Sequence, residues 1–101
     1  MNKAQTIEFW KEQIATQQAW AGRALLRIAA EQTADELEAR GTFQKNSVGF
    51  SALDASILTS LAEQLKDRGT LSPKQWAIVH KRMPRYAGQL YRLTQPATGE
   101  A

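Results

Sequence analysis

Apolar residues recur every three or four positions along the first third of the chain, with polar residues between them. The apolar positions are Ile7, Trp10, Ile14, Ala21, Leu25 and Ile28. Because this spacing puts them on one side of a helix, residues 4–40 are predicted to form an amphipathic helical segment. Gly22 lowers helix propensity by about 1 kcal/mol relative to alanine. We therefore expect either one long helix that bends at Gly22 or two shorter helices, with a second weak point at Gln32 and Thr33.

The residues that follow contain helix-ending and turn-forming signals. Residues 33–36 are typical of a new helix N-terminus, because acids in a first turn interact favourably with the helix dipole, and Gly41 is a natural C-terminal stop. Residues 42–50 are predicted to form the main loop, whose Asn46 and Gly49 tolerate positive φ angles. The loop also contains three apolar residues, Phe43, Val48 and Phe50. These favour packing of the loop back onto the helices.

A further helix is predicted to begin after Ser51, with Ser51 as its N-cap and Asp54 as the capping-box partner. Four apolar residues of this helix follow one another at intervals of four: Leu53, Ile57, Leu61 and Leu65. This row is predicted to face the core, and Gly69 is expected to end the helix.

The clearest helix start in the chain is Ser72. Its hydroxyl suits an N-cap, Pro73 falls at the first helical position, where its missing N–H is not needed, and Gln75 completes a capping box. Pro84 removes a backbone hydrogen bond and clashes with the preceding turn. It is therefore predicted to end or kink this helix and to leave residues 85–93 as a separately directed segment.

No stretch of the chain alternates in the manner of a β-strand. The sequence therefore predicts an all-α fold, a small bundle of three to five helices with a long N-terminal helix. Residues 1–93 are expected to form a single helical domain, made of an N-terminal helical arm (1–41) and a helical module (42–93). The tail, residues 94–101, contains Pro96 and Gly99 and is expected to be disordered.

Composition narrows the function classes. The chain has 101 residues and no cysteine, which excludes disulfides and cysteine-based zinc or redox sites. It has no apolar run of the length that a signal peptide or a membrane span needs. These features predict a cytoplasmic protein with no membrane partner.

Positive charge is concentrated near the C-terminus. Between Arg68 and Gly99 there are six Lys or Arg residues and no Asp or Glu, whereas the net charge of the whole chain is +3. The candidate nucleic-acid-binding residues are Lys74, Lys81, Arg82, Arg85 and Arg92. Several cations at regular helical spacing suit a phosphate backbone, of either DNA or RNA and of one or two strands. The alternative, a solvated basic face, remains equally open.

Two aromatic residues accompany the cations. Trp76 and Tyr86 suit a stacking platform for unpaired bases, but they share a helix side with Met83 and Leu90, which favours the interpretation that both are core anchors. Trp10 and Trp20 fall on different faces of the N-terminal segment. One is expected in the core; the other is either a protein–protein anchor, if exposed, or simply half-buried.

Catalytic chemistry is not indicated. His80 is the only histidine, and no carboxylates stand at the spacing of a helical metal site. There is no glycine-rich phosphate loop, and Asp54 is interpreted as a capping residue. We therefore expect no enzyme activity, no metal and no cofactor.

Three motifs together resemble a short helical module associated with helicase-like and other DNA-processing proteins of phages and mobile elements. They are an Asn-x-x-Gly-Phe loop with an Asp four residues on (residues 46–54), a Leu-Ser-Pro-Lys-Gln helix start (71–75) and an Arg-Tyr-Ala-Gly-Gln-Leu end (85–90). The resemblance covers residues 42–93 and implies nucleic-acid work together with other proteins. It carries over no catalytic residue, and no motor motif is present.

Two hypotheses of function follow. The first is a non-catalytic nucleic-acid-binding accessory protein that acts within or beside a larger nucleoprotein machine. The second is a protein–protein interaction subunit or inhibitor, such as a small helical subunit of an RNA-guided or replication complex, without direct nucleic-acid specificity.

Overall fold

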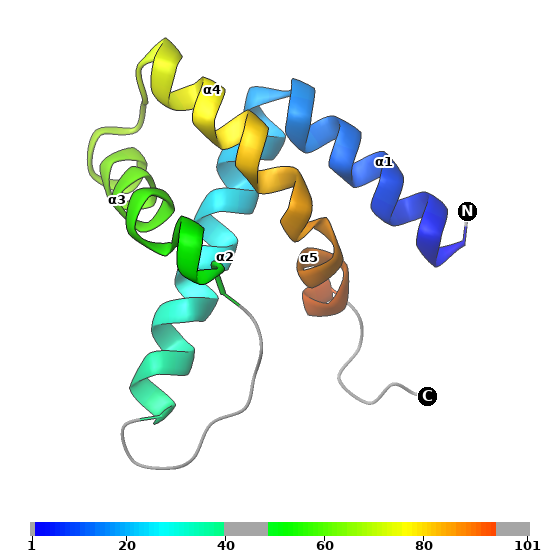
Figure 1. Cartoon of the computed structure of the whole chain (residues 1–101), viewed down its shortest axis with the longest axis horizontal. Coiled ribbons are helices and arrows are strands. Elements are labelled where there is room, and N and C mark those ends of the chain that lie inside the picture. Colours follow the sequence, from blue (N-terminus) through cyan, green and yellow to red (C-terminus); the bar gives the residue numbers. More distant parts are fainter. Residues whose placement is uncertain (1, 40–48, 95–101) are drawn as a thin grey trace.

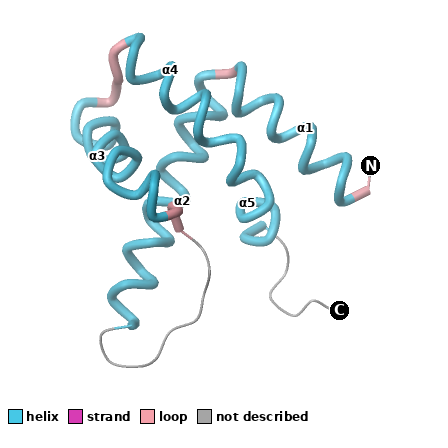
Figure 2. Tube along the Cα trace, viewed as in Figure 1, coloured by secondary structure: helices cyan, strands magenta, loops and turns pink. Residues whose placement is uncertain are grey.

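The computed structural model describes residues 2–39 and 49–94, with the side chains of residues 33–39 left out of the description. In these ranges the chain is helical throughout, apart from short connections (Figures 1 and 2). The elements are α1 (Lys3–Thr16), α2 (Gln18–Ala39), α3 (Ala52–Arg68), α4 (Pro73–Arg82), the 3-10 helix η1 (Met83–Tyr86) and α5 (Ala87–Thr94). The predicted all-α class is confirmed. The expectations for Gly41, Phe43, Asn46, Val48 and the tail from residue 95 lie outside the described residues.

The N-terminal segment is two helices, but they separate at Gln17 and not at Gly22. Gln17 is extended, with φ −110° and ψ 120°, a conformation open to any residue. Gly22 instead lies inside α2 beside α4, where an added Cβ would come 3.2 Å from Cη2 of Trp76. The prediction of a bend at Gly22 is therefore wrong, because this glycine permits close packing. The second weak point is also wrong, since α2 continues past Gln32 to Ala39.

α2 and the α4–η1–α5 segment form the middle of the molecule, and α1 and α3 flank them on opposite sides (Figure 1). The core collects residues from all of these elements. Its fully buried apolar side chains of largest volume are Ile14, Leu25, Ile28, Leu58, Val79 and Met83. The helical segment before residue 40 thus shares one core with the segment after residue 49.

The face that α3 buries differs from the predicted one. Leu61 is buried and Leu65 packs against the core, as predicted, but Leu53 is 86% exposed and Ile57 is 37% exposed. The buried positions are instead Asp54, Leu58, Leu61 and Ala62. The predicted row was therefore wrong in its first two members, because the helix is turned so that Asp54 faces α4 and η1.

The local signals for helix ends are largely confirmed. Gly69 ends α3 in the left-handed region, with φ 78°. Ser72 and Gln75 form the predicted capping box, with N–O distances of 2.8 and 3.2 Å. The α-helix ends at Arg82, and Pro84 lies in the 3-10 turn, after which α5 takes another direction (Figure 1).

Candidate functional site

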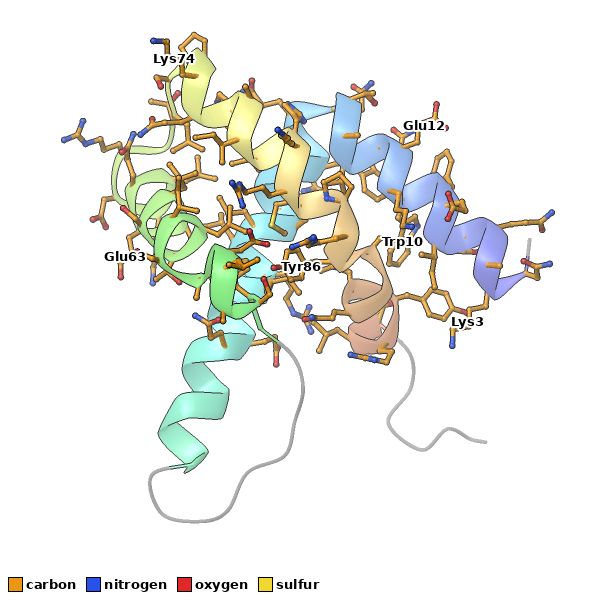
Figure 3. The ribbon with its side chains drawn as sticks, viewed as in Figure 1. Lys3, Trp10, Glu12, Glu63, Lys74 and Tyr86 are labelled. Atoms are coloured by element: carbon orange, nitrogen blue, oxygen red, sulfur yellow. The ribbon has the colours of Figure 1, made fainter. Side chains whose placement is uncertain are left out.

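The carboxylate of Asp54 is fully buried and accepts three side-chain hydrogen bonds. Arg82 donates to its Oδ1 at 2.7 Å, and Arg85 donates to its Oδ2 at 3.0 Å. The Tyr86 hydroxyl donates to Oδ2 at 2.6 Å and accepts the backbone N–H of Ser51 at 2.9 Å. We call this set, Ser51, Asp54, Arg82, Arg85 and Tyr86, the Asp54 cluster. In Figure 3 Tyr86 lies between α3 and the α4–α5 segment, as this role requires.

Burial alone would raise the pKa of Asp54, because a charge loses its hydration in the protein interior. The hydrogen bonds from Tyr86, Arg82 and Arg85 outweigh this effect and hold the pKa below its ordinary value of 3.8. The hydrogen bond to Asp54 in turn raises the pKa of the Arg85 guanidinium. Asp54 is therefore ionised at neutral pH and acts as a permanent anchor for two arginines.

This arrangement corrects the interpretation of Asp54 as a capping residue. The side chain of Ser51 makes no capping hydrogen bond at the start of α3, and Asp54 faces inward. A sequence signal for the inward position was present, because Asp54, Leu58, Leu61 and Leu65 are spaced by four, three and four residues. That spacing is as typical of a helix as the spacing of the predicted row that begins at Leu53.

Two glutamines hold the chain where it enters α3. The side-chain amide of Gln89 accepts the N–H of Gly49 at 2.9 Å and donates to its carbonyl at 3.1 Å. Gln32 accepts the N–H of Phe50 at 2.9 Å. Phe50 is buried and meets the ring of Tyr86 edge to face, with centroids 5.6 Å apart. Gly49 has a positive φ angle, 143°, of the kind that a glycine tolerates.

The first and third motifs of the resemblance therefore contact each other through their polar groups. Gly49 and Asp54 from the first motif meet Arg85, Tyr86 and Gln89 from the third. The second motif is tied to α3 by a reciprocal pair of amide hydrogen bonds between Gln75 and Gln64, at 2.8 and 3.0 Å. The hydrogen bonds of Gln32 and Gln89 were not predicted from the sequence.

The five predicted nucleic-acid-binding residues fall into two groups. Arg82 and Arg85 belong to the Asp54 cluster but keep 43% and 57% of their side chains exposed. Lys74, Lys81 and Arg92 are exposed, and no described carboxylate lies within ion-pair distance of them. Because α4 ends at Arg82, the candidates Lys74, Lys81 and Arg85 do not lie along a single α-helix.

The remaining candidate side chains contact other parts of the fold: Trp76 and Tyr86 pack in or against the core, and His80 contacts α1. Tyr86 is buried and Trp76 packs against the core, in agreement with their interpretation as core anchors. Nδ1 of His80 lies 2.9 Å from the carbonyl oxygen of Ile14, so this nitrogen carries the hydrogen and donates it. Carbonyls in the last turn of a helix lack an intrahelical partner, and His80 supplies one to α1.

Within residues 2–39 and 49–94, no group of three or more His, Cys, Asp and Glu side chains is placed to hold a metal ion. No described helix combines the length and apolar character that crossing a membrane requires. Comparisons with protein-family models, with curated proteins and with solved structures found no significant match.

Proposed function

We propose that this protein is a non-catalytic nucleic-acid-binding accessory that contacts phosphates through the cations of residues 68–93, within or beside a larger nucleoprotein machine. The observation that carries the proposal is the arginine pair of the Asp54 cluster. Each arginine uses one Nη1 to hold Asp54, while about half of each side chain faces solvent. A guanidinium has five N–H donors in a planar fork, so further donors of Arg82 and Arg85 are free for phosphate oxygens.

Anchoring of the arginines supports the proposal energetically. A long side chain loses rotamer entropy when a ligand immobilises it, at a cost of about 0.5–1.5 kcal/mol. The ion pairs with Asp54 already restrict Arg82 and Arg85 in the free protein, so part of this cost is met before binding. Such preorganised guanidiniums suit planar, two-pronged contact with phosphate.

The lysines of α4 extend the positive surface. Lys74 and Lys81 are seven residues apart, which is about two helical turns or roughly 10 Å along the axis. They lie on the side of α4 opposite Val79, the buried residue of that helix. Neither lysine has an ion-pair partner among the described residues, so their charge is available to a polyanion.

The test is a fluorescence-anisotropy titration of the full chain with short labelled oligonucleotides, single- and double-stranded, of DNA and RNA. The key variant replaces Lys74, Lys81 and Arg92 with glutamine, which keeps helix propensity and leaves the Asp54 cluster intact. For duplex DNA, each phosphate contact contributes about −0.9 to the slope of log K against log salt. We expect the variant to bind more weakly and its slope to flatten by about 2 to 3.

The matched control replaces Arg23, Arg27 and Lys66 with glutamine and so lowers the net charge by the same amount from the surfaces of α2 and α3. The proposal requires that this control retain more affinity and a steeper slope than the key variant. Equal weakening by both triples would show that only bulk charge matters. No binding of the unmodified chain at low salt would overturn the proposal.

A further inference from the structure

A second surface, distinct from the basic one, lies where α1, α2 and α5 meet. Four aromatic residues, Phe9, Trp10, Trp20 and Tyr91, form what we call the aromatic cluster. The rings of Phe9 and Trp20 are 6.1 Å apart, those of Trp10 and Trp20 6.2 Å, and those of Trp10 and Tyr91 5.9 Å. Phe9 is nevertheless 43% exposed and Trp20 37% exposed. Large exposed aromatics that are held in place by their neighbours are typical of protein-binding surfaces.

A groove opens beside this cluster. It has a volume of about 290 Å³, and its floor includes Trp10, Trp20, Ala24 and Leu90. Since a cavity of about 150 Å³ accommodates benzene, the groove has room for one large apolar side chain and part of the backbone that carries it. Its lining therefore favours an apolar anchor over a polar small molecule.

The rim of the groove is positively charged. Arg23 and Arg27 both line it, and no carboxylate does. Arg27 forms an ion pair with Glu31, with 3.2 Å between Nε and Oε2. Arg23 has no ion pair with any described carboxylate. A matching ligand would place a negative charge against Arg23, next to the apolar floor.

From this combination we infer that the groove binds a peptide segment of a partner protein, with one large apolar side chain in the groove and an Asp or Glu against Arg23. Apolar packing on tryptophan supplies most of the affinity, and the charge selects acidic segments and speeds their association. The inference does not depend on the proposed nucleic-acid role, because none of the groove residues belongs to the basic surface.

The probe is a random peptide library displayed on phage and selected against the full chain. We expect the selected peptides to share a large apolar residue flanked by Asp or Glu. A synthetic copy of the best peptide is then titrated into ¹⁵N-labelled protein. The indole N–H signals of Trp10 and Trp20 should shift, while that of Trp76, which packs on α2 from α4, should stay in place.

Arg23→Glu supplies the decisive variant, because this exposed side chain can be changed without disturbing the core. We expect it to weaken peptide binding about tenfold or more while the protein melts like the unmodified chain. The matched control is Lys74→Glu, which makes the same charge change at the far end of α4, well away from Trp10 (Figure 3). It should leave peptide binding within about twofold, since charges beyond a Debye length are largely screened.

Several results would overturn the inference. They are selected peptides without an acidic–apolar pattern, no enriched peptide at all, equal effects of the two variants, or shifts at Trp76 alone. Thr94 also lines the groove, so the chain's own residues 95–101 are a competing occupant. Tighter peptide binding by a chain ending at Thr94 would support that occupant instead. A dimer in sedimentation that Arg23→Glu dissociates would assign the groove to a second copy.

Discussion

Replacing Asp54 with asparagine tests the central feature of this fold. The substitution keeps the size of the side chain but removes its charge, and it puts an N–H₂ group where one oxygen accepted hydrogen bonds. Arg82, Arg85 and Tyr86 all donate to Asp54. An amide has a single oxygen, so at least one of these donors loses its acceptor in the variant.

The magnitude follows from the exposure of each partner. Tyr86 is 3% exposed, and a hydrogen bond to a charged group at a buried site contributes about 1.5–3 kcal/mol. The two arginines are about half exposed, and such pairs contribute little because solvent screens them. We therefore expect Asp54→Asn to lower the free energy of unfolding by about 2–3 kcal/mol. For a domain of this size that is a fall in Tm of about 8–24 °C.

The assay is thermal and urea unfolding followed by circular dichroism. Asp67→Asn is the matched control, because it makes the same chemical change at an exposed position of the same helix, where we expect an effect within about 0.5 kcal/mol. Tyr86→Phe removes the main hydrogen-bond donor, so the double variant with Asp54→Asn should cost less than the sum of the two single changes. If Asp54→Asn melts within about 2 °C of the unmodified protein, the Asp54 cluster does not stabilise the fold.

The same group predicts the acid response. Because the native state lowers the pKa of Asp54 below its ordinary value of 3.8, the unfolded state binds this proton more readily. The contribution of Asp54 is thus fully present above pH 3.8 and is lost as the pH falls from there through the native pKa. Asp54→Asn should flatten the decline in stability over that acidic range, as measured by urea unfolding at a series of pH values.

Two further stability predictions follow from α3 and its entrance. Leu61→Ala should lower the free energy of unfolding by about 2–5 kcal/mol, because Leu61 is buried. Leu53→Ala, at a surface position, should change it by no more than about 0.5 kcal/mol. The reverse order in urea unfolding would mean that the other face of α3 is buried. Gly49→Ala should lower the free energy of unfolding by more than about 1 kcal/mol. Its φ is 143°, and the new Cβ would lie 3.2 Å from Oε1 of Gln32. A variant as stable as the unmodified chain would show that this turn rearranges freely.

Several helix ends could be predicted from the sequence because they depend on local interactions. The helix start at Ser72, the end of α3 at Gly69 and the interruption at Pro84 each depend on backbone hydrogen bonds within a few residues. One such signal went unread, the capping box of Asn2 and Gln5 that begins α1. The all-α class followed because helical spacing of apolar residues recurs along the chain and strand spacing does not.

The candidate sites could be predicted only in part from the sequence. The cations of residues 74–92 are visible in the sequence as a run without acids, but their separation into an anchored pair and an unpaired group depends on Asp54, which lies 28 residues before Arg82. The aromatic cluster was hidden for a similar reason. On one continuous helix Trp10 and Trp20 would lie about 15 Å apart along the axis, and they meet because the chain turns at Gln17.

The sequence by itself determined the bounds of α3, the start of α4 and the interruption at Pro84, because those signals act between neighbouring residues. Only the tertiary structure decided which face of α3 is buried, because rows beginning at Leu53 and at Asp54 have equally helical spacing. The choice between them depends on what α4 and η1 present to α3. Two arginines and a tyrosine hydroxyl satisfy a buried carboxylate there, and a buried charge without such partners would cost several kcal/mol. Asp54 therefore turns inward and Leu53 remains at the surface.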